Sequence, residues 1–342
     1  PQKNKYCSSD CLAQSKASPT EIKRIKLEER LVERLDQYLA LHPGKRIKIA
    51  PVRKKAQNSK ASVHEMMLLL SDAHFSERVD PETAMGICYN EEIAQRRLER
   101  IRDVTIRYKD LRSEAYPVRK LTVAMLGDML SGDIHEELEV TNQNPTPVAL
   151  VNLAYILHGI FADLAAEFDE LEVIVIPGNH PRTKQKPRFK QKTTLNLEYI
   201  LGHFLAALAR SAYKVQVPKD LVYVHTVFGW RVGLTHGDGV QSNSFAGVPW
   251  YGMRQRQNAL QALLRHLGQP GVDYLCMGHF HTPALISSAD CVLILNGAVK
   301  GGDEYSIGTR LASNDPVQLL LTFHDTHGIA DTQGAGSSCN SM

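Results

Sequence analysis

The chain has 342 residues, a length that suits one large α/β domain with a small appendage. Hydrophobic residues make up 43% and charged residues 23%, an ordinary globular composition that excludes a fibrous or wholly disordered chain. The net charge of +3 is too small to indicate a polyanionic partner by itself, so that question depends on where the charges lie. The polar first residues and the lack of a continuous apolar run of roughly 18 to 20 residues predict neither a signal peptide nor a membrane span.

The cysteines indicate a reducing compartment. Cys276 and Cys291 lie in apolar runs, as buried reduced thiols do, and no disulfide framework is indicated. Together with the start of the chain, this usage predicts a cytoplasmic protein. Because the first residue is Pro rather than Met, we expect further residues to precede it.

Residues 1–63 are rich in Lys and Arg and contain one amphipathic helical pattern, residues 19–41, which ends at His42-Pro43-Gly44. We therefore predict a basic helical appendage over residues 1–63. Cys7 and Cys11 resemble the second half of a treble-clef zinc finger, but two cysteines cannot close a four-ligand zinc site. They are either free thiols or the remnant of a finger whose first half lies before Pro1.

Residues 64–327 alternate between short apolar runs and helical patterns, as expected for strands that are covered on both faces. Strands are predicted at residues 66–70, 121–126, 171–176, 232–234, 274–277, 292–295 and 317–322. Helices are predicted at residues 91–112, 147–168, 195–213 and 254–267. The pattern predicts an α/β domain, followed by a disordered tail over residues 328–342, where Gly, Ser, Asn and Gln prevail.

Five of the predicted strands are followed directly by side chains that can bind metal ions. The five segments are Asp72-Ala73-His74, Gly127-Asp128, Gly178-Asn179-His180, His236-Gly237-Asp238 and Gly278-His279-Phe280-His281. In open α/β sheets the carboxyl ends of strands border the ligand-binding crevice, so we expect these side chains to converge. Carboxylates, amide oxygens and imidazoles without a thiol suit Mn, Fe, Zn or Mg.

In this order and at these positions, the five motifs resemble those of the calcineurin-like metallophosphoesterase superfamily. The resemblance covers residues 72–281 and implies two packed mixed β-sheets flanked by helices in a four-layer sandwich. It implies two divalent metal ions, with Mn as the expected metal and Fe, Zn or Mg as alternatives. Asp72, His74, Asp128 and His281 would hold one ion, and Asp128, Asn179, His236 and His279 would hold the other. His180 would contact the substrate phosphate and assist the leaving oxygen, while a hydroxide that bridges the metals attacks phosphorus in line.

The motifs depart from the family pattern at two positions. Many relatives have acidic residues where Ser131 and Pro181 stand here, and one of these orients the substrate-binding histidine. Asp133 or His135 would take over that orienting role, or each is a solvated loop residue. Because no Asp-Arg-Gly sequence follows the Gly-Asp pair, a Ser/Thr protein phosphatase is disfavoured.

The loop after His180 is strongly basic. Its candidate substrate-binding residues are Arg182, Lys184, Lys186, Arg188, Phe189 and Lys190. Such a loop either is simply solvated or attracts a phosphate backbone, with Phe189 stacking on a base.

These features favour a DNA nuclease similar to the SbcD-type repair nucleases or phage metallophosphoesterases, with nucleic acid as the partner and no membrane. One alternative is a phosphomonoesterase or a small-molecule or cyclic-nucleotide phosphodiesterase. An alternative of another class is a noncatalytic nucleic-acid-binding protein with a structural metal site. The sequence does not indicate an oligomeric state.

Overall fold

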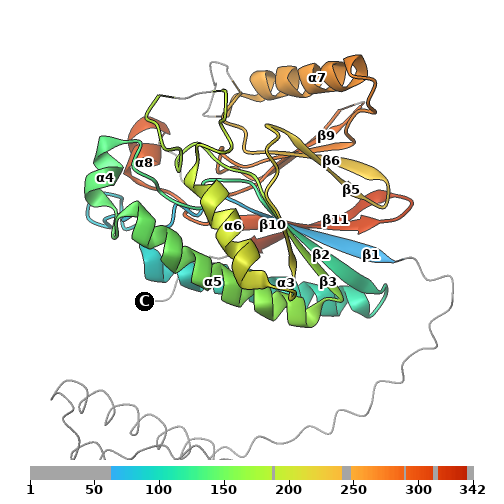
Figure 1. The fold of residues 1–342 in the computed structure, drawn as a ribbon, viewed down its shortest axis with the longest axis horizontal. Helices are drawn as coiled ribbons and strands as arrows, with labels where there is room; N and C mark the ends of the chain where they lie inside the picture. The colour runs from blue at the N-terminus through green and yellow to red at the C-terminus, as the bar shows by residue number, and fades with distance from the viewer. Residues whose placement is uncertain (1–62, 187–188, 241–247, 289, 311–314, 337–342) are drawn as a thin grey trace, which may run out of the picture. The chain divides into compact units, whose positions relative to one another are not determined.

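The computed structural model describes residues 63–186, 189–240, 248–288, 290–310 and 315–336. The predicted appendage lies outside the described residues except for Val63, and so do Cys7, Cys11 and Arg188. Figure 1 shows how the described helices and strands are arranged.

A six-stranded mixed sheet has the order β11-β10-β1-β2-β3-β4. Its strands are β1 (His64–Leu70), β2 (Val118–Met125), β3 (Glu170–Val175), β4 (Lys214–Gln216), β10 (Val317–His324) and β11 (Gly328–Gly336). The pairs β1–β2, β2–β3 and β3–β4 are parallel, whereas β10 pairs antiparallel with β1 and β11 pairs antiparallel with β10. The carboxyl ends of β1, β2 and β3 therefore meet at one edge of this sheet.

A five-stranded mixed sheet has the order β5-β6-β7-β9-β8. Its strands are β5 (Tyr223–Val227), β6 (Trp230–Thr235), β7 (Tyr274–Met277), β8 (Ala284–Ser287) and β9 (Val292–Leu295). The three central strands β6, β7 and β9 are parallel, and the two outer strands are antiparallel to their neighbours. This sheet contributes the carboxyl ends of β6 and β7.

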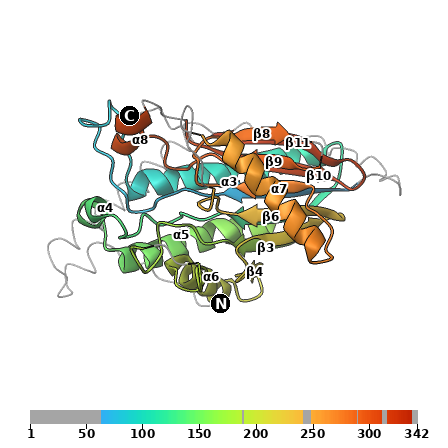
Figure 2. The same ribbon diagram turned by 90° about the horizontal axis from the view of Figure 1, so that it is seen from above.

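The helices are α3 (Glu91–Ser113), α4 (Glu136–Thr141), α5 (Thr146–Glu167), α6 (Leu197–Ala209), α7 (Trp250–His266) and α8 (Glu304–Arg310). Helices α3, α5 and α6 lie on one side of the paired sheets, and α7 lies on the other (Figure 1). Figure 2 looks onto the five-stranded sheet from the side of α7.

Alternation along the strands builds the separate layers of the core. In β1, Met66 and Leu68 pack toward α3 and α5, whereas Met67 and Leu69 pack between the two sheets. A third cluster lies between the five-stranded sheet and α7 and includes Met277. Since a strand covered on both faces is apolar at successive positions, this packing explains the continuous apolar runs of the sequence. The prediction of an α/β fold with two packed mixed sheets flanked by helices is confirmed.

Helix α5 is long and apolar enough, by length and composition, to cross a membrane, with a mean hydropathy of 1.7 over its best window. Its apolar face nevertheless packs against the core of the domain. Leu153, Leu157, Phe161 and Leu164 are buried in the cluster beneath the six-stranded sheet. A core helix of this kind satisfies the same length and composition test.

The prediction of a disordered tail is wrong for residues 328–336, because they form β11 against β10. Backbone hydrogen bonds to the neighbouring strand hold this segment, so pairing overrides its Gly-rich composition. The short strands β4, β5 and β8 and the helices α4 and α8 were not among the predicted elements. Their few residues carry too little periodicity to be recognised from sequence.

Candidate metal centre

The side chains predicted as metal ligands all lie just beyond the carboxyl ends of parallel strands. Asp72 and His74 follow β1, Asp128 follows β2, and Asn179 follows β3 in the six-stranded sheet. His236 follows β6, and the pair His279 and His281 follows β7, in the five-stranded sheet. The two sheets are packed face to face, and their five strand ends bring these side chains together.

The backbone of this region adopts an unusual conformation. Five of the seven predicted ligands have positive φ: 55° at Asp72, 44° at His74, 53° at Asp128, 69° at His279 and 54° at His281. L-residues other than glycine rarely occupy this left-handed region, and such strain is found preferentially at functional sites.

Two glycines allow the backbone to pass directly behind the carboxylates. A Cβ atom at Gly178 would lie 2.1 Å from Oδ1 of Asp128, and one at Gly278 would lie 2.7 Å from Oδ2 of Asp72. No side chain fits at such distances, so these two positions require glycine.

The first set of ligand atoms comprises Oδ1 of Asp72, Nε2 of His74 and Nε2 of His281. The His74 and His281 nitrogens lie 3.3 Å apart, and His281 Nε2 also lies 3.3 Å from Asp72 Oδ1. Atoms that share one ion at about 2.1 Å in tetrahedral geometry lie about 3.4 Å from each other. These three side chains could therefore hold a metal ion.

The second set is centred on Nε2 of His236. This nitrogen lies 3.0 Å from Asp128 Oδ2, 3.0 Å from Asn179 Oδ1 and 3.2 Å from His279 Nδ1. One nitrogen cannot donate a proton to all three groups, whereas a shared cation satisfies all four atoms together. His236 Nδ1 donates to the carbonyl of Leu126 at 2.7 Å, which leaves Nε2 as the ligand atom once the ring is neutral.

Asp128 lies between the two sets. It belongs to one ligand-like group with His236 and His279, and to another with His74 and His180. Its burial would raise the pKa, but the charges of His236 and His180 hold the pKa well below its usual range. A bridging ligand must be a carboxylate that lies within reach of two ions, and Asp128 is a buried carboxylate with candidate ligands on two sides.

The imidazoles around Asp128 differ in charge. Burial opposes protonation of His236, yet the Asp128 carboxylate raises the pKa of His236 to about 10. Burial, followed by the charge of His236, lowers the pKa of His279 to about 4. Burial also lowers the pKa of His74. His74 and His279 are therefore neutral at pH 7 and ready to bind a cation, and His236 must release its proton.

His180 lies beside these groups and is held by the backbone. Its Nδ1 donates to the carbonyl of Ser131 at 3.0 Å, and its ring centroid lies 4.5 Å from that of His74. Asp133 and His135 were predicted as possible orienting partners of His180, but the hydrogen bond at its Nδ1 is made with the Ser131 carbonyl. Asp133 instead accepts a hydrogen bond from Thr146, and the His135 ring lies 5.4 Å from the His180 ring.

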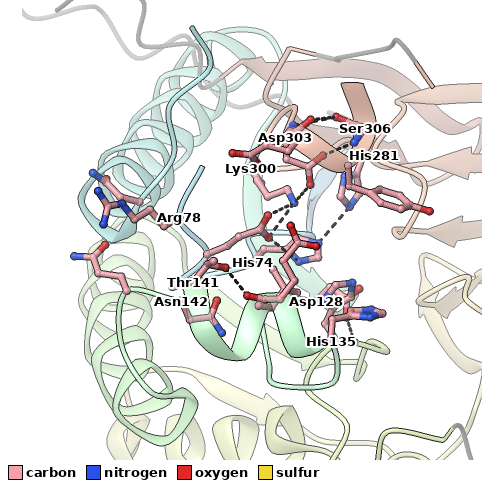
Figure 3. A pocket seen from close by; sticks show the side chains of 18 of the residues that line it. His74, Arg78, Asp128, His135, Thr141, Asn142, His281, Lys300, Asp303 and Ser306 are labelled. Atoms are coloured by element: carbon pink, nitrogen blue, oxygen red, sulfur yellow. Dashed lines mark hydrogen bonds and ion pairs between the residues drawn. The ribbon is translucent and has the colours of Figure 1, made fainter. Parts of the chain in front are cut away.

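A cleft of about 1550 Å³ opens over the predicted ligands. Figure 3 looks into it: Lys300 and Asp303 lie near His281, and Thr141 and Asn142 lie on the other side of His74. The carboxylates in its lining are Glu77, Asp80, Glu92, Glu137, Asp303 and Glu304, besides Asp128, and the cations are Arg78 and Lys300. Away from the metal ligands, the walls of this cleft are therefore acidic.

The predicted substrate-binding loop does not contribute to that lining. Among its described residues, Arg182, Lys184, Lys186, Phe189 and Lys190 are all absent from the cleft wall. Arg182 donates to the carbonyls of Asn179 and Gln185, so its guanidinium supports the loop itself.

The end of this loop is tied to the opposite sheet. Lys192 pairs with Asp238 at 2.6 Å, two residues beyond His236. Both ends of the loop therefore adjoin the predicted ligands, while residues 183–186 and 189–190 between them are exposed, with Phe189 at 76%.

Three residues that sequence reasoning missed support the site from behind. The carboxylate of Glu77 lies 3.7 Å from His74 Nδ1 and accepts from buried Lys300 at 2.7 Å. Glu198 contacts the backbone of two ligand loops. The Asn196-x-Glu198 pattern signals the start of a helix, but no local pattern could have indicated which loops this helix would touch.

Comparisons with known proteins find similarity only at the level of solved structures. No protein-family model matches the chain, and no curated protein does. Vps29 complexed with zinc from Entamoeba histolytica is similar at 13% identity, with 80% of this chain and 99% of that chain covered and a TM-score of 0.31. A predicted phosphoesterase from Streptococcus pneumoniae has 10% identity, coverage of 80% and 98%, and a TM-score of 0.30. An archaeal phosphodiesterase has 12% identity, coverage of 79% and 98%, and a TM-score of 0.34. Similarity this low says nothing about the chemistry of this chain.

Proposed function

We propose that this chain is a metallophosphoesterase that hydrolyses a phosphodiester with two divalent metal ions. The observation that carries the proposal is the convergence of two sets of ligand atoms on either side of Asp128, with neighbouring atoms 3.0 to 3.3 Å apart. Asp72, His74, Asp128 and His281 would hold one ion, and Asp128, Asn179, His236 and His279 the other.

When bound, the two ions would acidify a water molecule and neutralise charge on the phosphate oxygens. The chain itself contributes His180. Because its Nδ1 proton is held by the Ser131 carbonyl, the opposite ring nitrogen is left to contact the phosphate or the leaving oxygen. Oxygen and imidazole ligands without a thiol favour Mn²⁺, with Fe, Zn and Mg as alternatives.

For the substrate we propose nucleic acid, making the chain a DNA nuclease of the kind indicated by the resemblance to SbcD-type and phage enzymes. The supporting feature is the basic loop, which adjoins the ligands at both ends and exposes Lys184, Lys186 and Lys190. Cations in this position would attract a polyanionic backbone without displacing the metal ligands.

A small phosphoester is the second candidate, favoured by a different observation. The carboxylates of the cleft wall, among them Asp80, Glu92 and Glu304, would repel an extended polyanion. A phosphomonoester or a small or cyclic phosphodiester would avoid that repulsion.

One set of assays tests the function and separates these substrates. The purified chain is incubated with Mn²⁺ and bis(4-nitrophenyl) phosphate, 4-nitrophenyl phosphate, single-stranded DNA or double-stranded DNA, each with and without EDTA. The proposal predicts that the chromogenic diester is cleaved and that EDTA stops the reaction. Failure to cleave any of these substrates with Mn, Fe, Zn or Mg would contradict it.

Loop variants then test the nuclease proposal. Replacing Lys184, Lys186 and Lys190 together by Ala should weaken DNA binding and lower the salt dependence of binding by up to about three counterions. Hydrolysis of the chromogenic diester should not change, and Lys214→Ala, an exposed lysine outside the loop, should leave both properties unaltered. If DNA is not cleaved, or is cleaved equally well by the triple variant, the loop is a solvated surface feature.

A further inference from the structure

We propose that Glu198 is a positioning residue that holds two metal-ligand loops at the separation needed for metal binding. The inference rests on the proposed function, because it concerns the same predicted ligands. Glu198 lies in the first turn of α6, and its side chain is fully buried, with 0% exposed.

The carboxylate of Glu198 connects the ends of two different strands. Its Oε1 accepts from the backbone N–H of Met129 at 2.5 Å, and its Oε2 accepts from the backbone N–H of Gly178 at 2.6 Å. Met129 directly follows Asp128, and Gly178 directly precedes Asn179. One side chain therefore sets the distance between the bridging carboxylate and a ligand of the second set.

Asn196 strengthens the same connection. Its Nδ2 donates to the carbonyl of Gly178 at 2.8 Å, while its Oδ1 accepts from the backbone N–H of Glu198 at 2.9 Å. Both backbone polar groups of Gly178 are thus held by the start of α6. Since Gly178 also passes directly behind the Asp128 carboxylate, a shift of this peptide would move both ligand loops.

The chemistry of the contact requires a carboxyl group. Two N–H donors approach the two oxygens of one side chain, and both oxygens of a carboxyl group can accept a hydrogen bond. Glutamine has the same shape but offers one oxygen, so its NH₂ group would face an N–H donor. Aspartate keeps both oxygens but is one methylene shorter and cannot reach both loops from the same backbone position. Residues that orient metal ligands typically contribute 10- to 100-fold to metal affinity or activity.

The test measures metal binding directly, by calorimetric titration of the metal-free chain with Mn²⁺. Glu198→Gln and Glu198→Asp should each bind Mn²⁺ at least tenfold more weakly than the unmodified chain. The Mn²⁺ concentration that gives half-maximal hydrolysis of bis(4-nitrophenyl) phosphate should rise in parallel. Glu172→Gln is the matched control: Glu172 is a buried carboxylate near the start of β3, bonded to Gln216, and its loss should leave Mn²⁺ affinity unchanged.

The outcomes separate this inference from the proposed function. If the unmodified chain binds none of Mn²⁺, Fe²⁺, Zn²⁺ and Mg²⁺, the proposed function fails; if it binds one of the other three instead of Mn²⁺, the variants are titrated with that ion. If it binds Mn²⁺ and Glu198→Gln binds equally well, the positioning role is wrong and the proposed function stands. Should both Glu198 variants fail to fold by circular dichroism, Asn196→Ala decides, because it loses a contact to the same peptide. Mn²⁺ affinity at least threefold weaker would support the role, and unchanged affinity would overturn it.

Discussion

The two ends of β1 offer a comparison between two gatherings of histidines. At the start of the strand, His64 stacks on Tyr116, with ring centroids 4.3 Å apart, and lies 5.3 Å from the ring of His324. Just beyond its other end, Asp72 and His74 join the histidines of the predicted metal centre. The same strand thus has imidazole clusters at both ends, in very different surroundings.

The difference lies in how many ligand atoms converge. At the start of β1, Asp325 Oδ1 lies 2.9 Å from His324 Nδ1, but this pair belongs to none of the groups of three or more described side chains that could hold an ion. Both ring nitrogens of His64 are buried without a hydrogen-bond partner, and the ring packs as an aromatic group. At the other end, carboxylate and amide oxygens lie about 3 Å from the imidazole nitrogens. Within the described part of the chain, every group of side chains spaced to share an ion lies at the carboxyl ends of the parallel strands. Neighbouring histidines therefore do not by themselves mark a candidate metal centre in this chain; the convergence of three or more ligand atoms from separate loops does.

The largest expected effect comes from removing charge at the centre of the site. Asp128→Asn preserves the shape of the side chain but removes the negative charge shared by both proposed ions. Hydrolysis of bis(4-nitrophenyl) phosphate should fall by roughly 10³-fold or more, because several kcal/mol of charge stabilisation are lost. The control is Asp331→Asn, the same change in a carboxylate that pairs with Arg112, and it should retain activity within about twofold. Equal activity of the two variants would contradict the claim that hydrolysis depends on the carboxylate of the candidate metal centre.

Removing His180 should separate catalysis from metal binding. In His180→Ala, we expect the rate of hydrolysis to fall by roughly 10² to 10⁴-fold, the usual contribution of a general acid or base. Mn²⁺ affinity should remain within about threefold, since His180 is not a proposed ligand. A variant that keeps full activity would show that His180 takes no part in catalysis, whereas loss of metal binding would make His180 a ligand.

The smallest effect is expected at the far end of β1, from His64→Phe. Phenylalanine can stack on Tyr116 without burying unpaired nitrogens, so the free energy of unfolding at pH 7.5 should change by less than about 1.5 kcal/mol. Hydrolysis should not change. A clear loss of activity in folded protein would mean that the two regions are coupled.

This variant should also change the pH dependence of stability. Burial, followed by the charge of His324, lowers the pKa of His64 in the folded chain. The unfolded chain, with an ordinary histidine pKa near 6.5, therefore binds more protons below that pH. The contribution of neutral His64 to the free energy of unfolding is complete above about pH 6.5. This contribution falls as the pH is lowered toward the reduced pKa. Thermal melts between pH 7.5 and 5.5 should show a smaller loss for His64→Phe than for the unmodified chain.

The sequence could predict features that depend on neighbouring residues, such as a strand and the candidate ligand that follows it. Each predicted ligand follows an apolar run directly, so the strand and its ligand could be recognised together, as with Asp128 after residues 121–126. The α/β class and the two mixed sheets followed from the same runs and from the resemblance they support. The convergence of these side chains agrees with the prediction, and their role as ligands remains a proposal.

What the sequence could not predict depends on contacts between distant segments. The hydrogen-bond partner of His180 Nδ1 is the backbone carbonyl of Ser131. Every residue has such a carbonyl, so the residue type at position 131 could not indicate this contact. Glu198 reaches two loops that precede it by 20 and 69 residues. Strand β11 is held along its length by backbone pairing with β10, and its apolar side chains in the core clusters are Ile329 and Ala335. In each case the deciding interaction involves backbone atoms, which are alike at every position of a sequence.

The most direct test of the two-ion centre is a crystal of the chain grown with Mn²⁺ and measured at a wavelength where manganese scatters anomalously. Two anomalous peaks roughly 3.5 to 4 Å apart, one among Asp72, His74 and His281 and the other among Asn179, His236 and His279, with Asp128 contacting both, are predicted. A single peak, or manganese bound away from these side chains, would contradict the account.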